Sequence, residues 1–290
     1  MSPRGFGLDR AAIRRSFDRA AAAYDESAVL QAEVRRQLLA RLDYVVLEPG
    51  VIVDVGCGTG HAAQALAGRY PSSRVIALDL AEGMLREARR HGSTLQVCGD
   101  AMRLPLGDAS VDLLFSSLTL QWCTDLDATF AEFRRVLRPR GLLNFTTFGP
   151  DTLSELRGAW GQADGQVHVS EFPDMHDVGD GLVRAGLAEP VLDVERYTLT
   201  YPDVFGLMRD LKAIGAHNAA AQRPRGLTGR RRLLAMQAAY ERHRRGGVLP
   251  ATYEVVFGQA WGPAGKPERG RRAGEFTFDP SAIGRRDAGT

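Results

Sequence analysis

The chain has 290 residues, of which 44% are hydrophobic and 25% are charged, and its formal net charge at pH 7 is +2. These values are typical of a soluble globular protein with one large domain, or with one domain and a substantial insertion. No apolar run approaches the roughly 18 residues that a membrane-spanning helix needs, so we expect no membrane association.

Cysteines and the N-terminal region bear on the cellular compartment. Cys57, Cys98 and Cys123 form an odd set without metal-ligand spacing, so we predict no metal site and a reducing cytoplasm. No apolar secretory segment stands near the N-terminus. Asp9 and Asp18 argue against a mitochondrial transit peptide, because such peptides avoid acids.

The first elements in chain order are two helices. Asp9 can cap a helix, and apolar residues follow it at helical spacing at Ile13, Phe17, Ala20 and Tyr24. A second helix is expected over about 27–42, before the turn at 48–50. We interpret residues 1–46 as a helical lid, with Tyr24 placed to cover a ligand pocket.

The stretch 51–60 reads Val-Ile-Val-Asp-Val-Gly-Cys-Gly-Thr-Gly and organises the rest of the chain. Its β-branched half predicts a buried parallel strand, and residues 61–70 predict a helix. A glycine turn between a strand and a helix lets the backbone approach a nucleotide-like ligand closely. The next strand, 74–79, ends in Asp79, which can accept hydrogen bonds from both hydroxyls of a ribose.

Strands and helices then alternate. Further strands are expected over 95–100, 110–117 and 141–148, with helices over 80–90 and 125–137. This alternation predicts an α/β fold with a doubly wound, mostly parallel seven-stranded sheet, in which ligands lie beyond the carboxyl ends of the strands. We expect the core to span 47–150.

The pattern changes after residue 150. Helices are expected over 151–160, 177–185, 201–215 and 229–245, and strands over 190–200 and 250–261. We interpret 151–261 as a substrate-binding insertion with the closing strands. The tail 262–290 is rich in Gly, Pro and Arg and is predicted to be disordered.

Several motifs together resemble the class I S-adenosylmethionine-dependent methyltransferases. They are the glycine turn after Asp54, Ala-Leu-Asp-Leu at 77–80, Gly-Asp at 99–100 and Val-Leu-Arg-Pro-Arg-Gly at 136–141. A nicotinamide dehydrogenase more often shows the wider G-x-G-x-x-G spacing. The resemblance therefore implies a Rossmann-like methyltransferase with S-adenosyl-L-methionine as cofactor.

The resemblance also implies roles for individual residues. Asp54 and the turn residues would hold the amino-acid end of the cofactor, and Asp79 would bind the ribose with Leu80 against the adenine. Asp100 would accept from the adenine amino group between Ala101 and Met102, and Ser116 or Ser117 would lie near the methionine part. The implied cofactor-binding set is Asp54, Gly56, Cys57, Gly58, Gly60, Asp79, Leu80, Asp100, Ala101, Met102, Ser116 and Ser117.

Most of the chain, from about 13 to 261, also closely resembles the malonyl-acyl-carrier-protein O-methyltransferases of biotin synthesis. It rests on Ser-Phe-Asp-Arg-Ala-Ala-Ala-Ala-Tyr at 16–24, Leu-Gln-Trp-Cys at 120–123 and Met-Arg-Asp-Leu-Lys-Ala-Ile-Gly-Ala-His-Asn at 208–218. It implies an enzyme that methylates the free carboxylate of a malonyl thioester. No Asn-Pro-Pro-type motif follows the fourth strand, which argues against an amino-group acceptor.

A malonyl acceptor needs a cation in its pocket. Arg209 and Lys212 are three residues apart on one predicted helix face and are candidates, and His217 could also bond the substrate. A solvated cationic helix face is an equal alternative for the first two. Tyr24 and Trp122 are candidates for positioning the substrate, or are core residues.

Arginines crowd the region that precedes the last strand. This basic segment can steer an acidic carrier protein, and it lacks the interleaved aromatic residues of a nucleic-acid platform. We therefore expect malonyl-acyl-carrier protein as partner and no nucleic acid. The candidate contact residues are Arg223, Arg225, Arg230, Arg231 and Arg232.

Two alternatives remain open from the sequence. The segments 148–157 and 250–253, with His168 between them, also resemble a mitochondrial assembly factor of respiratory complex I that hydroxylates an arginine. The third hypothesis is a non-catalytic protein that binds the cofactor. The intact glycine turn with both acids, Asp79 and Asp100, argues against that third hypothesis.

Overall fold

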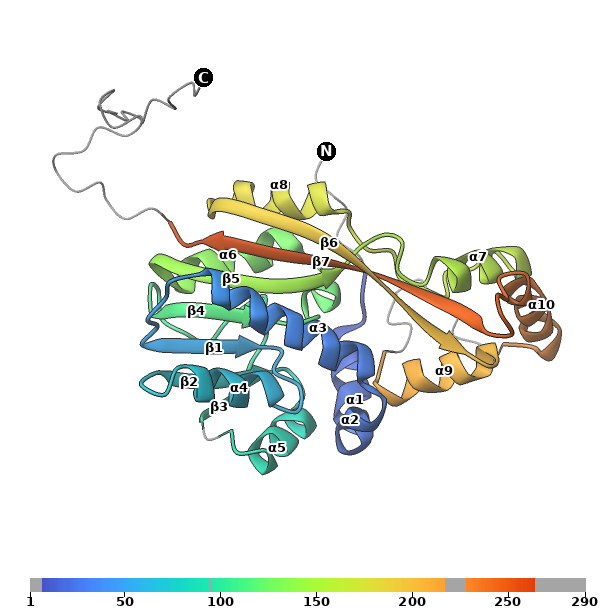
Figure 1. Ribbon diagram of the computed structural model, residues 1–290, viewed down its shortest axis with the longest axis horizontal. Coiled ribbons are helices and arrows are strands. Elements are labelled where there is room, and N and C mark those ends of the chain that lie inside the picture. The colour runs from blue at the N-terminus through green and yellow to red at the C-terminus, as the bar shows by residue number, and fades with distance from the viewer. Residues whose placement is uncertain (1–6, 94, 217–227, 264–290) are drawn as a thin grey trace, which may run out of the picture.

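The computed structural model describes residues 7–93, 95–216 and 228–263 (Figure 1). The predicted disordered tail 262–290 falls almost wholly outside these residues. Three predicted binding residues also lie outside the described residues: His217, a candidate for the substrate, and Arg223 and Arg225, candidates for the carrier protein.

A seven-stranded sheet in the order β3-β2-β1-β4-β5-β7-β6 forms the centre of the molecule. Strands β1 to β5 are parallel, and β7 and β6 are antiparallel to their neighbours. The predicted doubly wound, mostly parallel sheet is thus confirmed. Its strands are β1 Val51–Val55, β2 Arg74–Asp79, β3 Leu95–Cys98, β4 Val111–Ser116, β5 Leu137–Phe148, β6 Ala188–Tyr201 and β7 Leu249–Trp261.

Helices precede, connect and follow these strands. Short 3-10 turns occupy Ala21–Ala23, Arg41–Tyr44 and Leu120–Trp122. The α-helices are α1 Arg10–Ala20, α2 Tyr24–Ser27, α3 Val29–Ala40, α4 His61–Arg69, α5 Glu82–Arg90, α6 Leu126–Val136, α7 Ser154–Ala163, α8 Met175–Ala185, α9 Val204–Ala213 and α10 Arg230–Glu241.

Two apolar clusters cover the two faces of the sheet. On one face, α3 and α4 pack against β1, β4 and β5 through side chains such as Leu38 and Leu66. On the other, α6 and α8 pack through Phe130, Phe133 and Leu182. Burying a large apolar side chain contributes about 1.5–3 kcal/mol, so these clusters hold the strand ends in fixed positions.

Strands β6 and β7 are longer than the rest of the sheet. Only 255–261 of β7 pair with β5, whereas 249–253 pair with 197–201 of β6 alone. The two strands therefore continue past the sheet as a ribbon, and α7, α9 and α10 gather around its far end (Figure 1). This arrangement extends the first apolar cluster outward, to Trp160 of α7 and Tyr240 of α10.

Most expected elements are present, and the differences lie at their ends. The helix expected over 151–160 begins only at Ser154, because the Thr152 amide closes a turn on the Gly149 carbonyl at 3.1 Å and Leu153 is left-handed, with φ of 54°. The helix expected from 201 begins at Val204, because the Asp203 carboxylate caps it through the Gly206 amide at 2.9 Å. The prediction for 229–245 was too long, since α10 ends at Glu241.

Two further ends differ near the strands. The third strand stops at Cys98, so Asp100 lies in the loop beyond it. The strand expected over 141–148 begins earlier, because β5 starts at Leu137, and its pairing with β4 shifts register between Val111 and Leu113. No helix in the described part of the chain is long and apolar enough to cross a membrane.

Candidate active site

A cavity opens beyond the carboxyl ends of the parallel strands. Each strand contributes a residue at or just past its end: Val55, Asp79, Asp100, Ser117 and Phe148. This is where ligands bind in open α/β sheets, because the strand ends present free backbone groups and the loops diverge there.

The glycine turn forms one wall of the cavity. Gly56 has φ of +71°, and a Cβ there would lie 2.0 Å from Thr119 Oγ1. Gly58 has φ of +52°, and a Cβ there would meet nothing within 4 Å. Gly56 is thus required by the protein itself, whereas the space beside Gly58 is left for a ligand.

Asp79 lies at the end of β2 beside this turn. Its two carboxylate oxygens accept hydrogen bonds from the Gly58 amide at 3.0 Å and the Ala81 amide at 2.8 Å. These bonds fix the carboxylate, and burial raises its pKa to about 6. A fixed carboxylate with lone pairs toward the cavity can accept from the two hydroxyls of a ribose.

Asp54 lies behind the turn rather than in the cavity wall. It is 1% exposed, and its Oδ2 atom has no hydrogen-bond partner among the residues described. Burial, reinforced by the charge of Asp79, raises the pKa of Asp54 to about 7. Burying a hydrogen-bond acceptor without a partner costs free energy. The unpaired Oδ2 atom of Asp54 beside the glycine turn therefore fits a ligand with a cationic or hydrated group at this place.

Helix α1 reaches the cavity at Asp100, the residue predicted to bind the adenine. Arg10 forms an ion pair with Asp100, and Phe17 contacts Trp122 edge to face, with 5.3 Å between ring centroids. Asp18 Oδ1 accepts from the Gly83 amide at 2.8 Å, which fastens α1 to α5. Helix α1 therefore lines the cavity, through Arg10, Ile13 and Phe17.

A second contact holds the lid to α4. Asp25 accepts from Thr59 Oγ1 at 2.7 Å and lies 3.0 Å from His61 Nε2. His61 stacks on His91, whose Nδ1 lies 2.9 Å from the Thr59 carbonyl. The possible ligand atoms of Asp25, His61 and His91 lie within 4.8 Å of one another, although the sequence predicted no metal. Neighbouring Tyr24 lines the cavity, and burial and the charge of Asp79 raise its pKa.

The structure brings most of the predicted cofactor-binding residues to the cavity wall and leaves others behind it. Ser116 instead donates to the Val55 carbonyl at 3.0 Å, and Gly60 packs where a Cβ would lie 2.7 Å from Ala88 Cβ. Cys57 is buried in the turn with a free thiol. Lining residues among those predicted are Gly56, Gly58, Asp79, Leu80, Asp100, Ala101, Met102 and Ser117, with Tyr24 and Trp122.

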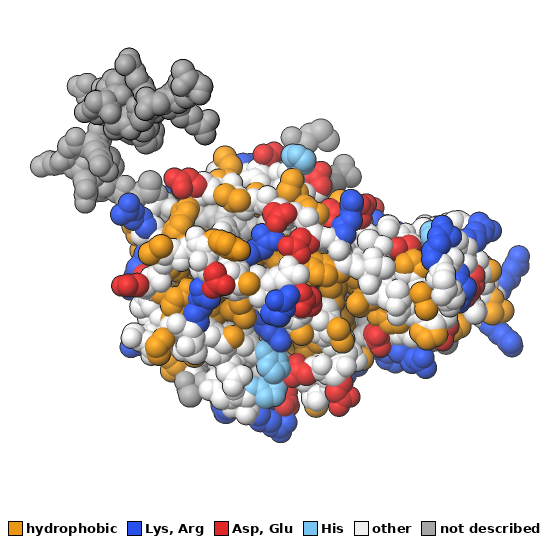
Figure 2. Space-filling model, in the orientation of Figure 1, with side chains coloured by type: hydrophobic (Ala, Val, Ile, Leu, Met, Phe, Trp, Pro, Cys, Tyr) orange, Lys and Arg blue, Asp and Glu red, His pale blue; other side chains and the backbone are white. Residues whose placement is uncertain are grey.

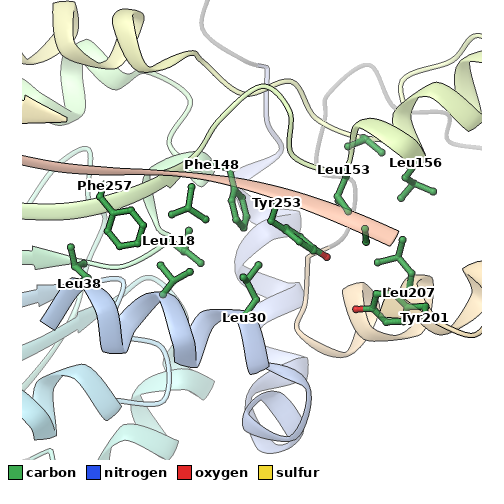
Figure 3. Close-up of a cluster of buried hydrophobic side chains, with 14 of the residues drawn as sticks. Leu30, Leu38, Leu118, Phe148, Leu153, Leu156, Tyr201, Leu207, Tyr253 and Phe257 are labelled. Atoms are coloured by element: carbon green, nitrogen blue, oxygen red, sulfur yellow. The ribbon is translucent and has the colours of Figure 1, made fainter. Parts of the chain in front are cut away.

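One part of the cavity, lined by Phe148, Phe172 and Tyr253 and here called the acceptor half, is aromatic and apolar. Phe148 at the end of β5 contacts Phe172 and Tyr253, with ring centroids 5.5 Å and 5.9 Å away. Figure 3 shows Phe148 and Tyr253 side by side along the sheet, with Leu153 and Leu156 facing them from the direction of α7. This half suits an acyl chain or thioester arm more than a sugar or nucleotide.

The predicted substrate cations do not line this cavity. Arg209 and Lys212 are exposed on α9, while Leu211 and Ile214 of the same segment line the cavity. Arg230, Arg231 and Arg232 are exposed at the start of α10. Figure 2 shows basic side chains over the end of the molecule where α10 lies.

Sequence reasoning missed several lining residues. Arg10 directly follows the predicted cap Asp9 and Thr119 directly precedes the motif at 120–123, but the sequence analysis gave neither residue a role. Gln121 lies beside the predicted Trp122, and its Oε1 is buried with no partner in the described chain. Thr152, His168 and Ser170 carry no recognisable spacing, and only the folding of 149–172 over the strand ends brings them to the cavity.

These features test the cofactor suggested by the sequence. The open space at Gly58, the fixed carboxylate of Asp79 and the partnerless oxygen of Asp54 fit the amino-acid and ribose parts of S-adenosyl-L-methionine. A family model described as a methyltransferase domain matches residues 53–145.

Solved structures share the fold. A Bacillus halodurans protein described as a methyltransferase has a TM-score of 0.56 at 18% identity, covering 79% of this chain and 99% of its own. The cyclase SpnF has a TM-score of 0.50 at 22% identity, covering 80% of this chain and 82% of its own. Fold and glycine-turn site together define a class I, Rossmann-like methyltransferase that uses S-adenosyl-L-methionine. The SpnF likeness shows that the fold alone does not fix the reaction.

Sequence relatives show to which family of methyltransferases the chain belongs. A malonyl-acyl-carrier-protein O-methyltransferase of Methylovorus sp. (strain MP688) is 56% identical over 91% of this chain and 92% of its own length. Proteins of the same name from Laribacter hongkongensis and Halorhodospira halophila are 52% and 48% identical, over 91% and 96% of this chain and 93% and 97% of their own lengths. The chain belongs to the malonyl-acyl-carrier-protein O-methyltransferase family. This membership favours the first sequence-based hypothesis over the assembly-factor and scaffold alternatives.

Proposed function

We propose that this chain methylates the free carboxylate of malonyl-acyl-carrier protein and so forms the methyl ester, as an early step of biotin synthesis. The observation that carries the proposal is the two-part cavity, in which an acid-lined cofactor half opens into an apolar acceptor half. Relatives at 48–56% identity carry the name of this reaction.

The chemistry asks little acid–base work of the protein. A malonyl carboxylate is ionised at neutral pH, so no general base is needed. S-adenosyl-L-methionine, held by the glycine turn and Asp79, would supply a methyl group on a sulfonium to a carboxylate oxygen, with the S–CH₃ electron pair returning to sulfur and no proton released.

The residues of the chain therefore act by binding and positioning. Asp79 and the glycine turn hold the cofactor against the ends of β1 and β2. Trp122 and Tyr24 close the cavity from the lid side, and Phe148 walls the acceptor half. Holding the two reactants in line supplies most of the rate gain, and excluding water strengthens the attraction between carboxylate and sulfonium.

The exposed cations form a docking face for an acidic carrier in this proposal. Arg230, Arg231 and Arg232 of α10 and the pair Arg209 and Lys212 of α9 are all exposed. Basic patches raise the association rate with acidic partners and are screened by salt. The proposed partner is the carrier protein rather than nucleic acid or membrane, and the proposed compartment is the cytoplasm. We also propose that the chain divides into a lid (1–46), a cofactor-binding core (47–150) and a substrate-binding insertion (151–261).

Mass spectrometry tests the reaction. Purified chain is incubated with S-adenosyl-L-methionine and either malonyl-carrier or acetyl-carrier protein. We expect a gain of one methyl group on the malonyl-carrier protein only. Unmodified malonyl-carrier protein, with cofactor binding intact, would contradict the proposal.

Charge reversal tests the docking face. Arg230→Glu with Arg231→Glu should raise the KM for malonyl-carrier protein about tenfold at low salt and leave the KM for malonyl-pantetheine unchanged, since the small substrate has no carrier to dock. Arg19→Glu, an exposed cation on α1, is the matched control. Equal effects on both substrates would remove α10 from the docking face.

A further inference from the structure

The acceptor half contains one histidine held in an unusually fixed position. His168 lines the cavity, and its ring stacks on Trp160 with centroids 3.7 Å apart and an interplanar angle of 12°. Its Nε2 atom lies 3.0 Å and 3.1 Å from the two carboxylate oxygens of Asp164. The ring thus has one face on an indole and one edge on a carboxylate.

The partner carboxylate is itself fixed. The Asp164 side chain is 5% exposed, accepts from the Gln166 amide at 3.1 Å and lies 3.9 Å from an Arg232 guanidinium nitrogen. Burial opposes ionisation of Asp164, but the hydrogen bonds from Gln166 and His168 outweigh it and hold the pKa of Asp164 below its usual value. The Asp164 carboxylate holds the Nε2 edge of the ring and Trp160 holds one face, which leaves the second ring nitrogen available to a ligand.

A malonyl acceptor requires a cationic hydrogen-bond donor inside the cavity. Among the lining residues that the structure describes, the basic side chains are Arg10 and His168. Arg10 lies at the adenine end and is paired with Asp100. His168 is in the acceptor half, four residues before Phe172, whose ring contacts Phe148 at the end of β5.

We propose that His168, held by Asp164 and Trp160, binds the malonyl carboxylate through its second ring nitrogen and so selects a malonyl group over an uncharged acyl group. The proposal rests on the proposed function and names the residue that recognises its substrate. One carboxylate oxygen bonds to this ring nitrogen, and the other is left to attack the methyl group.

A histidine side chain suits this reaction better than a guanidinium, which is always charged. The carboxylate loses its charge as the ester forms, so a strong cation that held the anion would stabilise the ground state more than the transition state. A histidine can hold the anion and then release the neutral ester. The interaction therefore belongs to substrate binding and should affect KM rather than kcat.

The test compares His168→Phe with wild type on malonyl-carrier protein. Phenylalanine keeps a ring for Trp160 and removes both nitrogens. Hydrogen bonds to charged groups are strong, so we expect the KM for malonyl-carrier protein to rise tenfold to a hundredfold, with kcat within threefold and the dissociation constant for S-adenosyl-L-methionine unchanged. Binding of the methyl-ester product should be unaffected, because it has no carboxylate.

Two further variants make the result specific. Asp164→Asn keeps the shape but removes the anion that orients the ring, so it should raise the same KM severalfold. His176→Phe makes the same exchange at an exposed histidine of α8 that does not line the cavity, and it should leave the KM within twofold. An unchanged KM for His168→Phe, or an equal rise for His176→Phe, overturns the proposal.

Failure of the proposed function is distinguished by the wild type. If the wild-type chain does not methylate malonyl-carrier protein, the proposed function itself fails. If the wild type does and His168→Phe binds malonyl-carrier protein and its methyl ester as the wild type does, only the role of His168 fails.

Discussion

The two halves of the cavity are built in different ways. The cofactor half is made of backbone and short acids from consecutive strand ends, namely the turn at Gly56 and Gly58 and the carboxylate of Asp79. The acceptor half is made of side chains from segments far apart in sequence, such as Phe148, His168 and Tyr253. A backbone-built site can be read from a local motif, whereas a side-chain-built site depends on how distant segments pack.

The strongest way to break this comparison is to remove the carboxylate of the cofactor half. Asp79→Ala should weaken S-adenosyl-L-methionine binding by at least a hundredfold, because two charge-assisted hydrogen bonds contribute roughly 1.5–3 kcal/mol each. Calorimetric titration measures the affinity, and thermal unfolding should show a folded variant. Unchanged affinity would show that the ribose does not bind at Asp79.

A matched pair of glycine variants separates the structural and ligand-facing parts of the turn. Gly56→Ala places a Cβ against Thr119 at a positive φ and should lower the free energy of unfolding by about 2–4 kcal/mol. Gly58→Ala meets no neighbour within 4 Å and should cost only about 1 kcal/mol while still weakening cofactor binding. Denaturant titration and calorimetry measure the two quantities. Equal destabilisation by both variants would contradict the division.

Asp54→Asn tests the buried oxygen without a partner. Because burial raises the pKa of Asp54 from its ordinary value near 4 to about 7, the wild-type folded state binds more protons than the unfolded state between these values. The stabilisation from this extra proton is present below pH 4 and lost as the pH rises through 7. The asparagine variant lacks this loss.

The expected result is a cofactor-free Asp54→Asn variant that gains roughly 1–3 kcal/mol over wild type as the pH rises from 5 to 8. Asp79 titrates in the same direction in both proteins, so the difference between their unfolding curves reports Asp54 together with its coupling to Asp79. A difference that does not change with pH would mean that the Asp54 carboxylate is satisfied in solution.

The smallest expected effect concerns the lid. Asp25→Ala removes the contacts with Thr59 and His61 and should raise the dissociation constant for S-adenosyl-L-methionine about threefold to tenfold, because the pairs are partly exposed. Glu26→Ala, the exposed neighbouring acid, is the matched control. Equal effects from the two variants would show that the lid is not held at Asp25.

The comparison of the two halves of the cavity also explains which sequence-based predictions agree with the structure. The alternation of strands and helices is a local signal repeated along the chain, and it gave the sheet and its ligand-binding edge. Arg209 and Lys212 were predicted from their charge, their helical spacing and the family-like segment 208–218. These signals place two cations on one face of a helix but do not say which face meets the cavity. In the folded chain, Leu211 and Ile214 meet it, because burying apolar side chains is favourable and burying cations is costly.

The sequence by itself determined which residues stand at the ends of the first three strands: glycines after the first, and acids after the second and third. Each of these positions depends only on the neighbouring residues in the chain. Tertiary structure alone decided the rest. It closed α1 over Asp100 through Arg10, and it brought His168 of the loop after α7 into the cavity through Trp160 and Asp164. Such contacts join residues without a fixed spacing, because the free energy that selects them comes from burial and pairing across the fold and not from the local chain.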